Sequence, residues 1–248
     1  MGGLAGRVAL VTGATGGIGA ETVRRLAAEG VRVAVTDVDL KPCVDLTAEL
    51  PGEHLVAALD VRDEALWAEI VDRVAAELGG LHILVNNAGI GSLGTVESET
   101  RERWDEVIGI DQLGTWLGMK YAGPLIERSG GGSIINVCSI LGTVGGLGDS
   151  LAYAAAKGAV RTLTKNAALH WAARGVRVNS LHPGFVGTAQ LLERFGGTAR
   201  HDAMLAGTPM GRLGRPEEIA GTIAFLAGDD AGFMTGSEIY ADGGWTAR

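Results

Sequence analysis

Residues 8–19 read VALVTGATGGIG, an apolar run that leads into a glycine-rich turn. An apolar run this short is typical of a strand buried on both faces, and the spacing of Val23 and Leu26 beyond the turn is helical. Glycines at such a turn let backbone N–H groups and the helix N-terminus approach a pyrophosphate. The segment therefore predicts the opening strand, turn and helix of a dinucleotide-binding fold. The turn residues expected to contact the dinucleotide are Gly13, Thr15, Gly17, Ile18 and Gly19.

The second apolar run, VRVAVT at residues 31–36, is followed by Asp37. A carboxylate at the end of this strand accepts hydrogen bonds from the adenosine ribose hydroxyls and repels a 2′-phosphate. None of the neighbouring residues Thr15, Gly16 and Val38 supplies the Arg or Lys that a 2′-phosphate needs. We therefore predict that the cofactor is NAD rather than NADP.

Short apolar runs alternate with amphipathic segments along most of the chain. Each run is too short for a helix and rich in β-branched residues, whereas residues 160–171 carry apolar side chains at helical spacing. This alternation predicts a single doubly wound α/β domain over residues 1–248, with about seven parallel strands and helices on both faces. The runs expected to form strands are residues 8–11, 31–35, 55–59, 83–85, 134–137 and 176–181.

Residues 187–210 interrupt this alternation with a mixture of large apolar residues and glycines. An insertion of this length in a compact α/β domain is usually a lid or a binding loop, and we expect a substrate lid here. The alternative is a helical excursion on the surface that contributes only to stability.

Two further strand ends carry residues suited to a dinucleotide. Asp60, followed by Val61, closes the third run, where it could hydrogen-bond an adenine or cap a helix that begins near Glu64. Residues 86–89 read NNAG and close the fourth run, where small residues would let a cofactor lie across the strand end. An ordinary turn is the alternative for this second segment. The cofactor-binding candidates in it are Asn87, Ala88 and Gly89.

A catalytic site is indicated by Tyr153 and Lys157 together with Ser139 at the end of the fifth run. Residues four apart share one face of a helix, so the phenol and the ammonium can point to the same site. A nearby ammonium favours the phenolate form of a tyrosine, which otherwise has a pKa near 10. Ser139 can donate a hydrogen bond to a substrate oxygen while Tyr153 exchanges the proton.

Taken together, these segments resemble the short-chain dehydrogenase/reductase family over essentially the whole chain. Pro183-Gly184 and the late segment at residues 242–244, DGG, also match the family. The resemblance implies that Tyr153 is the general acid/base and that Ser139 positions the carbonyl. It further implies that Lys157 binds the nicotinamide ribose and lowers the pKa of Tyr153.

The same resemblance extends to the cofactor and to assembly. It implies that the nicotinamide and the diphosphate are held by Pro183, Gly184, Val186 and Thr188. It also implies a homotetramer, whose interfaces are formed by the two long central helices and the C-terminal strand.

One position departs from the family, because Asp111 occupies a place that is normally Asn. Asp111 shares one predicted helical face with Trp104, Val107 and Ile108, so its carboxylate should point inward. The family's proton relay uses the backbone carbonyl of this residue, so the exchange need not abolish activity.

A buried carboxylate needs a partner, and Lys157 is the candidate for Asp111. An ionised Asp111 would stabilise the charge on Lys157 and oppose formation of the Tyr153 phenolate. We therefore expect Asp111→Asn to lower the pH at which alcohol oxidation reaches half its maximal rate. The alternative is that Asp111 only replaces Asn and caps a local helix distortion.

Composition limits the partners and the compartment. The net charge of −8 argues against nucleic acid and anionic membranes, and no apolar run is long enough to span a bilayer. Two cysteines and a start without a signal-peptide pattern favour the cytoplasm. The five histidines lack metal-ligand spacing, so we expect no metal site. His182 precedes Pro183 and could be either a core residue or part of the pocket.

The segments near the expected site are mostly apolar and uncharged. Residues 140–148, Ser92, Leu93 and the lid would line a pocket for a hydrophobic cyclic or aryl secondary alcohol, such as a hydroxysteroid, or its ketone. A 3-oxoacyl thioester reductase is the alternative enzyme, although Asp37 and the acidic chain oppose the NADP and the basic surface it requires. A non-catalytic NAD-binding sensor or scaffold is the alternative from another class, and it would not need Ser139, Tyr153 and Lys157.

Overall fold

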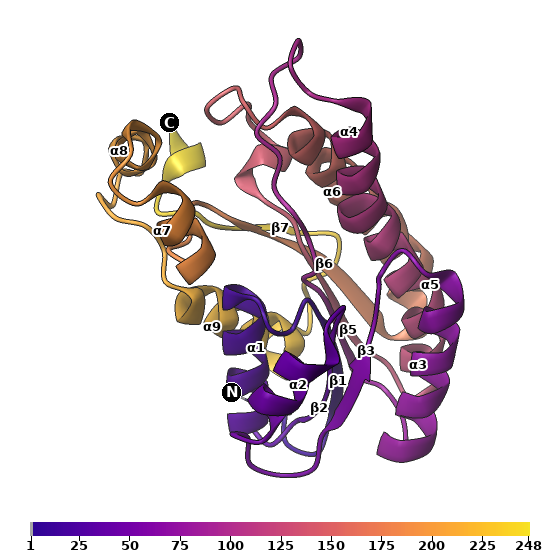
Figure 1. Cartoon of the computed structure of the whole chain (residues 1–248). Coiled ribbons are helices and arrows are strands. Elements are labelled where there is room, and N and C mark those ends of the chain that lie inside the picture. The colour runs from indigo at the N-terminus through magenta and orange to yellow at the C-terminus, as the bar shows by residue number, and fades with distance from the viewer. Residues whose placement is uncertain (1) are drawn as a thin grey trace.

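The computed structural model describes residues 2–248 and contains one parallel sheet (Figure 1). Its strands are β1 (Val8–Thr12), β2 (Arg32–Asp37), β3 (Leu55–Ala58), β4 (Ile83–Asn86), β5 (Gly132–Val137), β6 (Val176–Pro183) and β7 (Glu238–Ala241). They pair in the order β3-β2-β1-β4-β5-β6-β7. The strand order reverses between β1 and β4, and in doubly wound sheets ligands bind in the crevice at the carboxyl ends of such strands.

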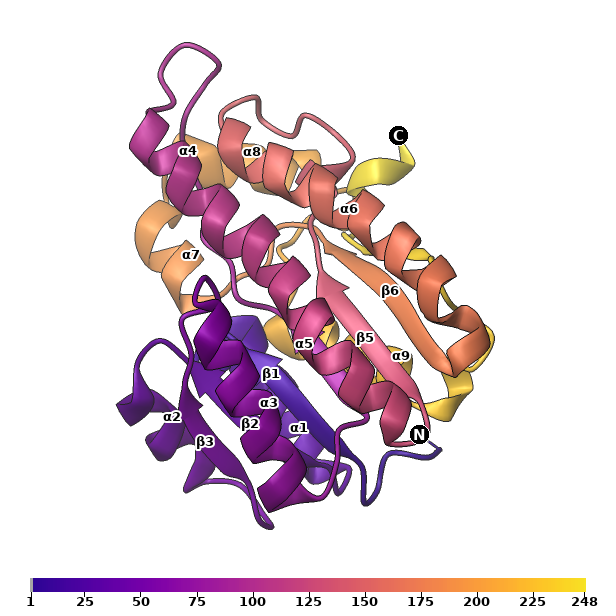
Figure 2. The same ribbon diagram turned by 90° about the vertical axis from the view of Figure 1, so that its right-hand side faces the viewer.

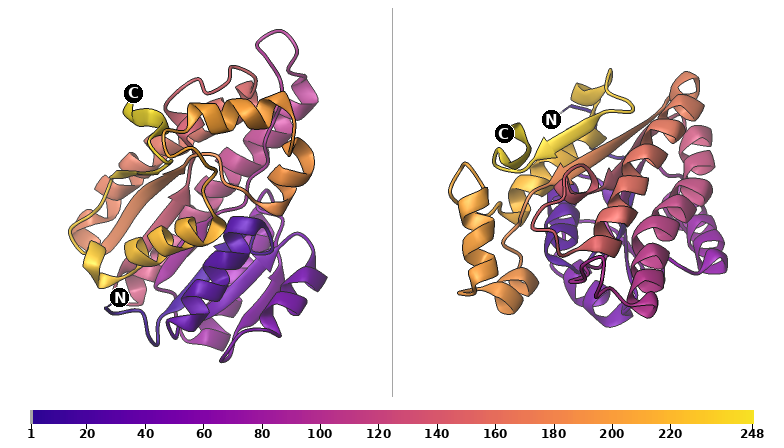
Figure 3. Two further views of the ribbon diagram at one scale, coloured as in Figure 1. Left: turned by 90° about the vertical axis from the view of Figure 1, so that its left-hand side faces the viewer. Right: turned by 90° about the horizontal axis from the view of Figure 1, so that it is seen from above.

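The helices are α1 (Gly17–Ala28), α2 (Leu40–Thr47), α3 (Glu64–Leu78), α4 (Arg101–Val107), α5 (Gly114–Arg128), α6 (Leu151–Trp171), α7 (Ala189–Phe195), α8 (Ala199–Gly207) and α9 (Pro216–Ala227). A π-helical turn, Ile108–Leu113, joins α4 to α5, and a short 3₁₀ turn, Ile140–Gly142, follows β5. Helices α3, α5 and α6 cover one face of the sheet, as Figure 2 shows. Helices α1, α2 and α9 cover the other face (Figure 3, left). The doubly wound architecture expected from the sequence is therefore confirmed.

Alternating residues of each strand enter two separate cores. Leu10 of β1 packs toward Trp67 of α3, while its neighbour Val11 packs toward Leu26 of α1. All four side chains are fully buried. Burial on both faces explains why the strands are continuous apolar runs rather than alternating ones.

The strands differ from the predicted runs mainly at their ends. Strand β6 extends to Pro183 and β5 begins at Gly132, because ladder hydrogen bonds continue past the apolar residues. The seventh strand, β7, matches none of the predicted runs. It is a partly buried edge strand of four residues, EIYA, so it lacks the continuous apolar pattern of the central strands.

Residues 187–210 form the two short helices α7 and α8 (Figure 1). Of their side chains only Met204 is buried. Within residues 2–248 no helix has the length and apolar character needed to cross a membrane.

Candidate active site

The predicted catalytic residues converge at the carboxyl edge of the sheet. Ser139 lies two residues after β5, whereas Tyr153 and Lys157 lie on the first two turns of α6. The 3₁₀ turn after Ser139 packs closely against α6, because a Cβ on Gly142 would lie 2.8 Å from the backbone carbonyl of Lys157. Glycine at this position thus brings the end of β5 against the catalytic helix.

The Ser139 hydroxyl is oriented by its own turn. Its oxygen accepts a hydrogen bond from the backbone N–H of Leu141 at 3.1 Å, and the side chain is buried. This N–H occupies only a lone pair of the oxygen, so the hydroxyl can still donate its own proton. The residue can therefore serve as a donor to an oxygen bound above the strand end.

Lys157 and Asp111 form a buried ion pair. Lys157 Nζ lies 3.1 Å from Asp111 Oδ2 and donates a hydrogen bond to the Val137 carbonyl at 3.0 Å. Asp111 is fully buried within the π-helical turn, and its Oδ1 accepts a hydrogen bond from the N–H of Ile90 at 2.9 Å. The expectation of an inward-facing Asp111 partnered by Lys157 thus agrees with the geometry. The helix distortion foreseen in the alternative is also present, but the side chain bonds to Ile90 rather than to its own helix.

Charge around this pair fixes the protonation of Lys157. Burial alone lowers the pKa of Lys157, but the neighbouring Asp111 and Tyr153 outweigh burial and hold that pKa above its ordinary value. The ammonium form is therefore strongly favoured. Gly89 permits the close approach, since a Cβ there would lie 2.8 Å from Asp111 Oδ2.

Lys157 lowers the pKa of Tyr153 as expected, but other influences outweigh it. Burial raises the pKa of the phenol, Lys157 lowers it, Asp111 raises it again, and a hydrogen bond with Ser139 lowers it. The net shift is upward. Burial is the largest cause of this rise, and the carboxylate of Asp111, which is paired with Lys157, adds to it.

The predicted dinucleotide turn is assembled at the same edge of the sheet. Gly13 has φ +59°, and a Cβ on Gly13 or Gly19 would collide with Ala88 or with the Gly13 carbonyl. Asn87 donates hydrogen bonds from its amide to the carbonyls of Thr12 and Gly13 at 3.0 and 2.9 Å. Asn87 therefore supports the turn, and Ala88 lies directly against it, while Ile18 packs inward beside the α1 core.

Asp37 lies beside this turn at the end of β2. Its Oδ2 accepts hydrogen bonds from Thr15, at 3.0 Å from the backbone N–H and 2.6 Å from the hydroxyl. Its Oδ1 accepts the N–H of Val38. A partly buried carboxylate therefore stands at the strand end where a ribose would lie, next to the glycine-rich turn. These residues fit a dinucleotide with free ribose hydroxyls.

Asp60 does not cap the next helix, so that alternative is wrong. Helix α3 is capped by Asp63, whose carboxylate accepts hydrogen bonds from the N–H groups of Ala65 and Leu66. Asp60 instead pairs with Arg62 at 2.6 Å, and Arg62 lowers the pKa of its carboxyl. Val61 is buried against α5. Asp60 remains half-buried at the end of β3, where it could still contact an adenine.

The segment after β6 reaches the glycine turn. A Cβ on Gly17 would lie 2.7 Å from the Thr188 side chain, and one on Gly184 would lie 2.8 Å from Asp242. Val186 is buried and forms an isolated bridge with Gly214. The structure thus places Pro183, Gly184, Val186 and Thr188 on the segment that leads from β6 to the start of α1.

Sequence reasoning missed several contributors to this site. Ser92, assigned only to the substrate pocket, is buried and accepts a hydrogen bond from the N–H of Tyr153 at 3.3 Å. Ile90 acts through its backbone, which no sequence pattern reveals. His182 is fully buried and contacts the Ser139 backbone. The sequence signal for this position is that the strand continues through His182 to Pro183, which places the histidine on β6 beside β5.

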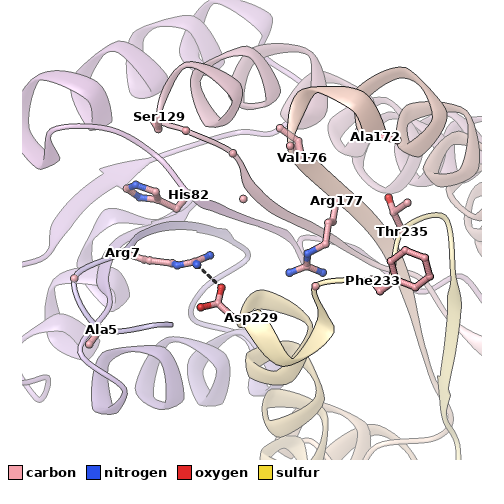
Figure 4. A pocket seen from close by; sticks show the side chains of 16 residues that line it. Ala5, Arg7, His82, Ser129, Ala172, Val176, Arg177, Asp229, Phe233 and Thr235 are labelled. Atoms are coloured by element: carbon pink, nitrogen blue, oxygen red, sulfur yellow. Dashed lines mark hydrogen bonds and ion pairs between the residues drawn. The ribbon is translucent and has the colours of Figure 1, made fainter. Parts of the chain in front are cut away.

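A cavity of about 950 Å³ lies elsewhere, at the amino edge of the sheet (Figure 4). It is lined by residues that precede or begin strands, such as His82 and Val176, and Arg7 there pairs with Asp229 at 2.5 Å. Among residues 2–248 no cluster of three or more metal-ligating side chains occurs. The predicted catalytic residues lie at the opposite, carboxyl edge of the sheet, so they do not line this cavity.

Comparisons with known proteins identify the family of this chain. A family model described as "Enoyl-(Acyl carrier protein) reductase" matches residues 13–246. The cis-4-hydroxycyclohexanecarboxylate dehydrogenase of Sinomonas cyclohexanicum is 44% identical over 97% of this chain and 97% of its own. The cyclohexanol dehydrogenase of an Acinetobacter strain is 38% identical, with 98% of this chain and 96% of its own covered.

A hydroxysteroid dehydrogenase and a solved structure are also similar to this chain. The 3-alpha-(or 20-beta)-hydroxysteroid dehydrogenase of Mycobacterium tuberculosis is 38% identical over 98% of this chain and 91% of its own. The crystal structure of a short-chain type dehydrogenase/reductase from Mycobacterium marinum superimposes with a TM-score of 0.93, at 33% identity and with 99% and 97% of the two chains covered. With its sheet order, its Ser139–Tyr153–Lys157 arrangement and these full-length relatives, the chain belongs to the short-chain dehydrogenase/reductase family.

Proposed function

We propose that this protein is an NAD-dependent oxidoreductase that interconverts a hydrophobic cyclic secondary alcohol and its ketone. The observation that carries the proposal is the meeting of Ser139, Tyr153 and the Lys157–Asp111 pair at one edge of the sheet. The same edge holds the glycine turn and Asp37. The residues proposed to transfer the proton and those proposed to hold the dinucleotide therefore share one edge of the sheet.

The chemistry divides between the cofactor and the chain. Bound nicotinamide supplies the hydride acceptor for oxidation and the hydride donor for reduction. The Tyr153 phenolate takes the hydroxyl proton of the alcohol, and the phenol returns a proton to the ketone oxygen. Ser139 donates its free hydroxyl proton to that same oxygen and so orients it. Lys157 keeps a positive charge 5.4 Å from the centre of the Tyr153 ring and has a donor available for a ribose hydroxyl.

Preference for NAD is supported by the charges around Asp37. A 2′-phosphate there would meet the Asp37 carboxylate, and among the described residues the basic side chains of the neighbouring segments are already paired. Lys41 is paired with Asp45, and Arg62 is paired with Asp60. Repulsion between two anions in a partly desolvated site disfavours NADP. The roles of Gly13, Thr15, Asp60 and the β6 segment in holding the cofactor belong to the same proposal.

A cyclic alcohol is supported by the relatives and by the loop after β5. Three relatives are named for ring substrates, namely a cyclohexanol, a hydroxycyclohexanecarboxylate and a hydroxysteroid. The loop contributes the partly buried apolar side chains Leu141, Val144 and Leu147, and no charged residue until Asp149. Apolar walls with few polar groups suit a ring that carries one hydroxyl.

We further propose that residues 1–248 act as one catalytic domain, in which residues 187–210 are a substrate lid, and that four copies associate. Exposed apolar side chains on α5 and α6 support the association, because Trp116 is 43% and Leu169 is 83% exposed. Cys43 and Cys138 are buried free thiols, which suits the reducing cytoplasm.

The test is spectrophotometric formation of NADH from a panel of secondary alcohols, with NADP in parallel. We expect turnover of cyclohexanols or hydroxysteroids with NAD, and a loss of about 10²–10⁴-fold in Tyr153→Phe with NADH binding retained. Tyr121→Phe is the matched control, because Tyr121 is bonded to Glu64 on the outside of α5. Reduction of a 3-oxoacyl thioester with NADPH alone would contradict the proposal, as would NADH binding with no turnover of any substrate.

A further inference from the structure

We propose that His182 and Tyr240 are positioning residues that fix the Ser139 segment against strands β6 and β7. The inference rests on the proposed function, because it concerns the residue that orients the substrate oxygen. Both side chains lie outside the Ser139–Tyr153–Lys157 arrangement. They reach the catalytic segment from the far side of β5.

His182 contacts the backbone of the catalytic serine. Its Nδ1 lies 3.0 Å from the carbonyl oxygen of Ser139, and its Nε2 lies 2.9 Å from Ser180 Oγ. A carbonyl oxygen can only accept, so Nδ1 carries the proton and Nε2 of the neutral ring is an acceptor. The Ser180 hydroxyl has one proton, and Nε2 at 2.9 Å is a nearer acceptor for it than the Ser237 carbonyl at 3.4 Å. The ring is fully buried, and burial lowers the pKa of His182. The neutral ring therefore holds one tautomer with both nitrogens bonded.

Tyr240 contacts the other end of the segment. Its hydroxyl lies 2.8 Å from Thr143 Oγ1 and 2.8 Å from Glu238 Oε2. A carboxylate accepts only, so Tyr240 donates to Glu238 and Thr143 donates to Tyr240. The Tyr240 ring also stacks on His182, with ring centroids 4.7 Å apart. The two anchors are thus one unit rather than two separate contacts.

Glu238 ties this unit to the catalytic helix. Its carboxylate is paired with Arg161 at 2.8 Å and Lys165 at 2.7 Å, and both cations come from α6. Burial opposes ionisation, but the hydrogen bonds of Lys165, Arg161 and Tyr240 outweigh it and lower the pKa of Glu238 to about 2. The acceptor for Tyr240 therefore stays charged at any pH used for catalysis.

The consequence is that the five residues from Ser139 to Thr143 are pinned at both ends. Between the anchors the segment is one 3₁₀ turn with short internal hydrogen bonds, and it contains no strand pairing of its own. Release of the Ser139 carbonyl would let the hydroxyl move relative to Tyr153. Displacements of about 1 Å at a reacting centre cost up to about 10²-fold in rate.

His182→Leu and His182→Asn test whether His182 positions the Ser139 segment through its hydrogen bond or only fills space in the core. Leucine fills the space without a donor, whereas the asparagine amide can donate from near the Nδ1 position. For His182→Leu we expect kcat for alcohol oxidation to fall about 10- to 100-fold, while the Kd for NADH is unchanged. His182→Asn should recover most of the rate. His170→Leu, the same exchange at an exposed position on α6, is the control.

A double-mutant cycle with Ser139→Ala decides whether His182 acts through the serine. If it does, His182→Leu costs little further rate once the serine hydroxyl is gone. Equal losses from His182→Leu in both backgrounds, or no loss in the wild-type background, would overturn the inference. Different results would contradict the proposed function: an inactive wild type, or full rate in both Ser139→Ala and Tyr153→Phe.

A second variant covers the case in which His182→Leu does not fold. Tyr240→Phe keeps the ring on His182 and removes only the hydroxyl link to Thr143 and Glu238. We expect kcat to fall at least about threefold with the NADH Kd unchanged, and Thr143→Val to give the same loss without adding to it. A wild-type kcat in Tyr240→Phe, or losses that add, would overturn the link between β7 and the serine segment.

Discussion

Replacement of Asp111 by Asn tests the electrostatics of the active site directly. Asp111 is buried beside Lys157: burial raises the pKa of its carboxyl and Lys157 opposes that rise, and in its ionised form the carboxylate raises the pKa of Tyr153. Asparagine removes that charge and keeps an oxygen for the N–H of Ile90. Because oxidation requires the phenolate, a lower Tyr153 pKa in Asp111→Asn moves the onset of activity to lower pH.

The size of the expected change in the Tyr153 pKa follows from two distances. Lys157 Nζ lies 3.1 Å from the Asp111 carboxylate and 5.4 Å from the centre of the Tyr153 ring. The carboxylate is therefore within roughly 8.5 Å of the ring, where two like charges repel by about 2 kcal/mol at an effective dielectric constant of about 20. That energy corresponds to roughly 1.4 pKa units. Solvent at the half-buried phenol reduces it, so we expect a shift of about one pH unit.

The assay is the pH profile of kcat/KM for alcohol oxidation with saturating NAD. The acidic limb should move downward in Asp111→Asn and stay in place in Asp105→Asn. Asp105 is the matched control, because it pairs with Arg101 on the exposed side of α4. An unchanged limb in Asp111→Asn would refute the reasoning and leave Asp111 only a structural part. A shift of the acidic limb to higher pH would show that Asp111→Asn acts mainly by weakening the positive charge on Lys157.

Three further predictions address the cofactor, the lid and the loop. Asp37→Ser should raise kcat/KM for NADP relative to NAD by about tenfold or more, and equal use of both cofactors by the wild type would contradict the role of Asp37. Backbone amides in residues 187–210 should exchange slowly with NADH and substrate bound and quickly without them; constant protection would rule out a lid. Gly142→Ala should lower the free energy of unfolding in urea by about 1–3 kcal/mol, because its Cβ meets the Lys157 backbone at 2.8 Å. Gly145→Ala, whose Cβ meets nothing within 4 Å, should match the wild type, and equal stability of both variants would contradict this packing.

Much of the fold was predictable because buried parallel strands leave a strong local pattern. The runs at β1 and β4 are apolar on both faces, and the turn at Gly13 requires the positive φ that only glycine adopts freely. The edge strand β7 escaped prediction because only part of its surface is buried. Its pairing with β6 depends on residues about 60 positions earlier, which local spacing does not encode.

The candidate site also has a part that local sequence predicts and a part that depends on the fold. Tyr153 and Lys157 share a helix, so their convergence followed from a spacing of four residues. The partners of that pair come from distant segments, and their effects depend on burial and distance. The opposing effect of Asp111 on the Tyr153 phenolate was expected, but the net rise in the pKa of Tyr153 was not, because its largest cause is burial, which the fold sets.

By itself the sequence determined the doubly wound fold, the glycine turn and the acid at the end of β2, and it predicted the proton-transferring residues. Local spacing and residue chemistry suffice for these. Only the tertiary structure decided that Asp111 touches Lys157 directly, that Asp63 rather than Asp60 caps α3, and that His182 holds the Ser139 backbone. Hydrogen bonds and charge interactions act over a few ångströms in space, and the folding of the chain alone sets which residues come within that range.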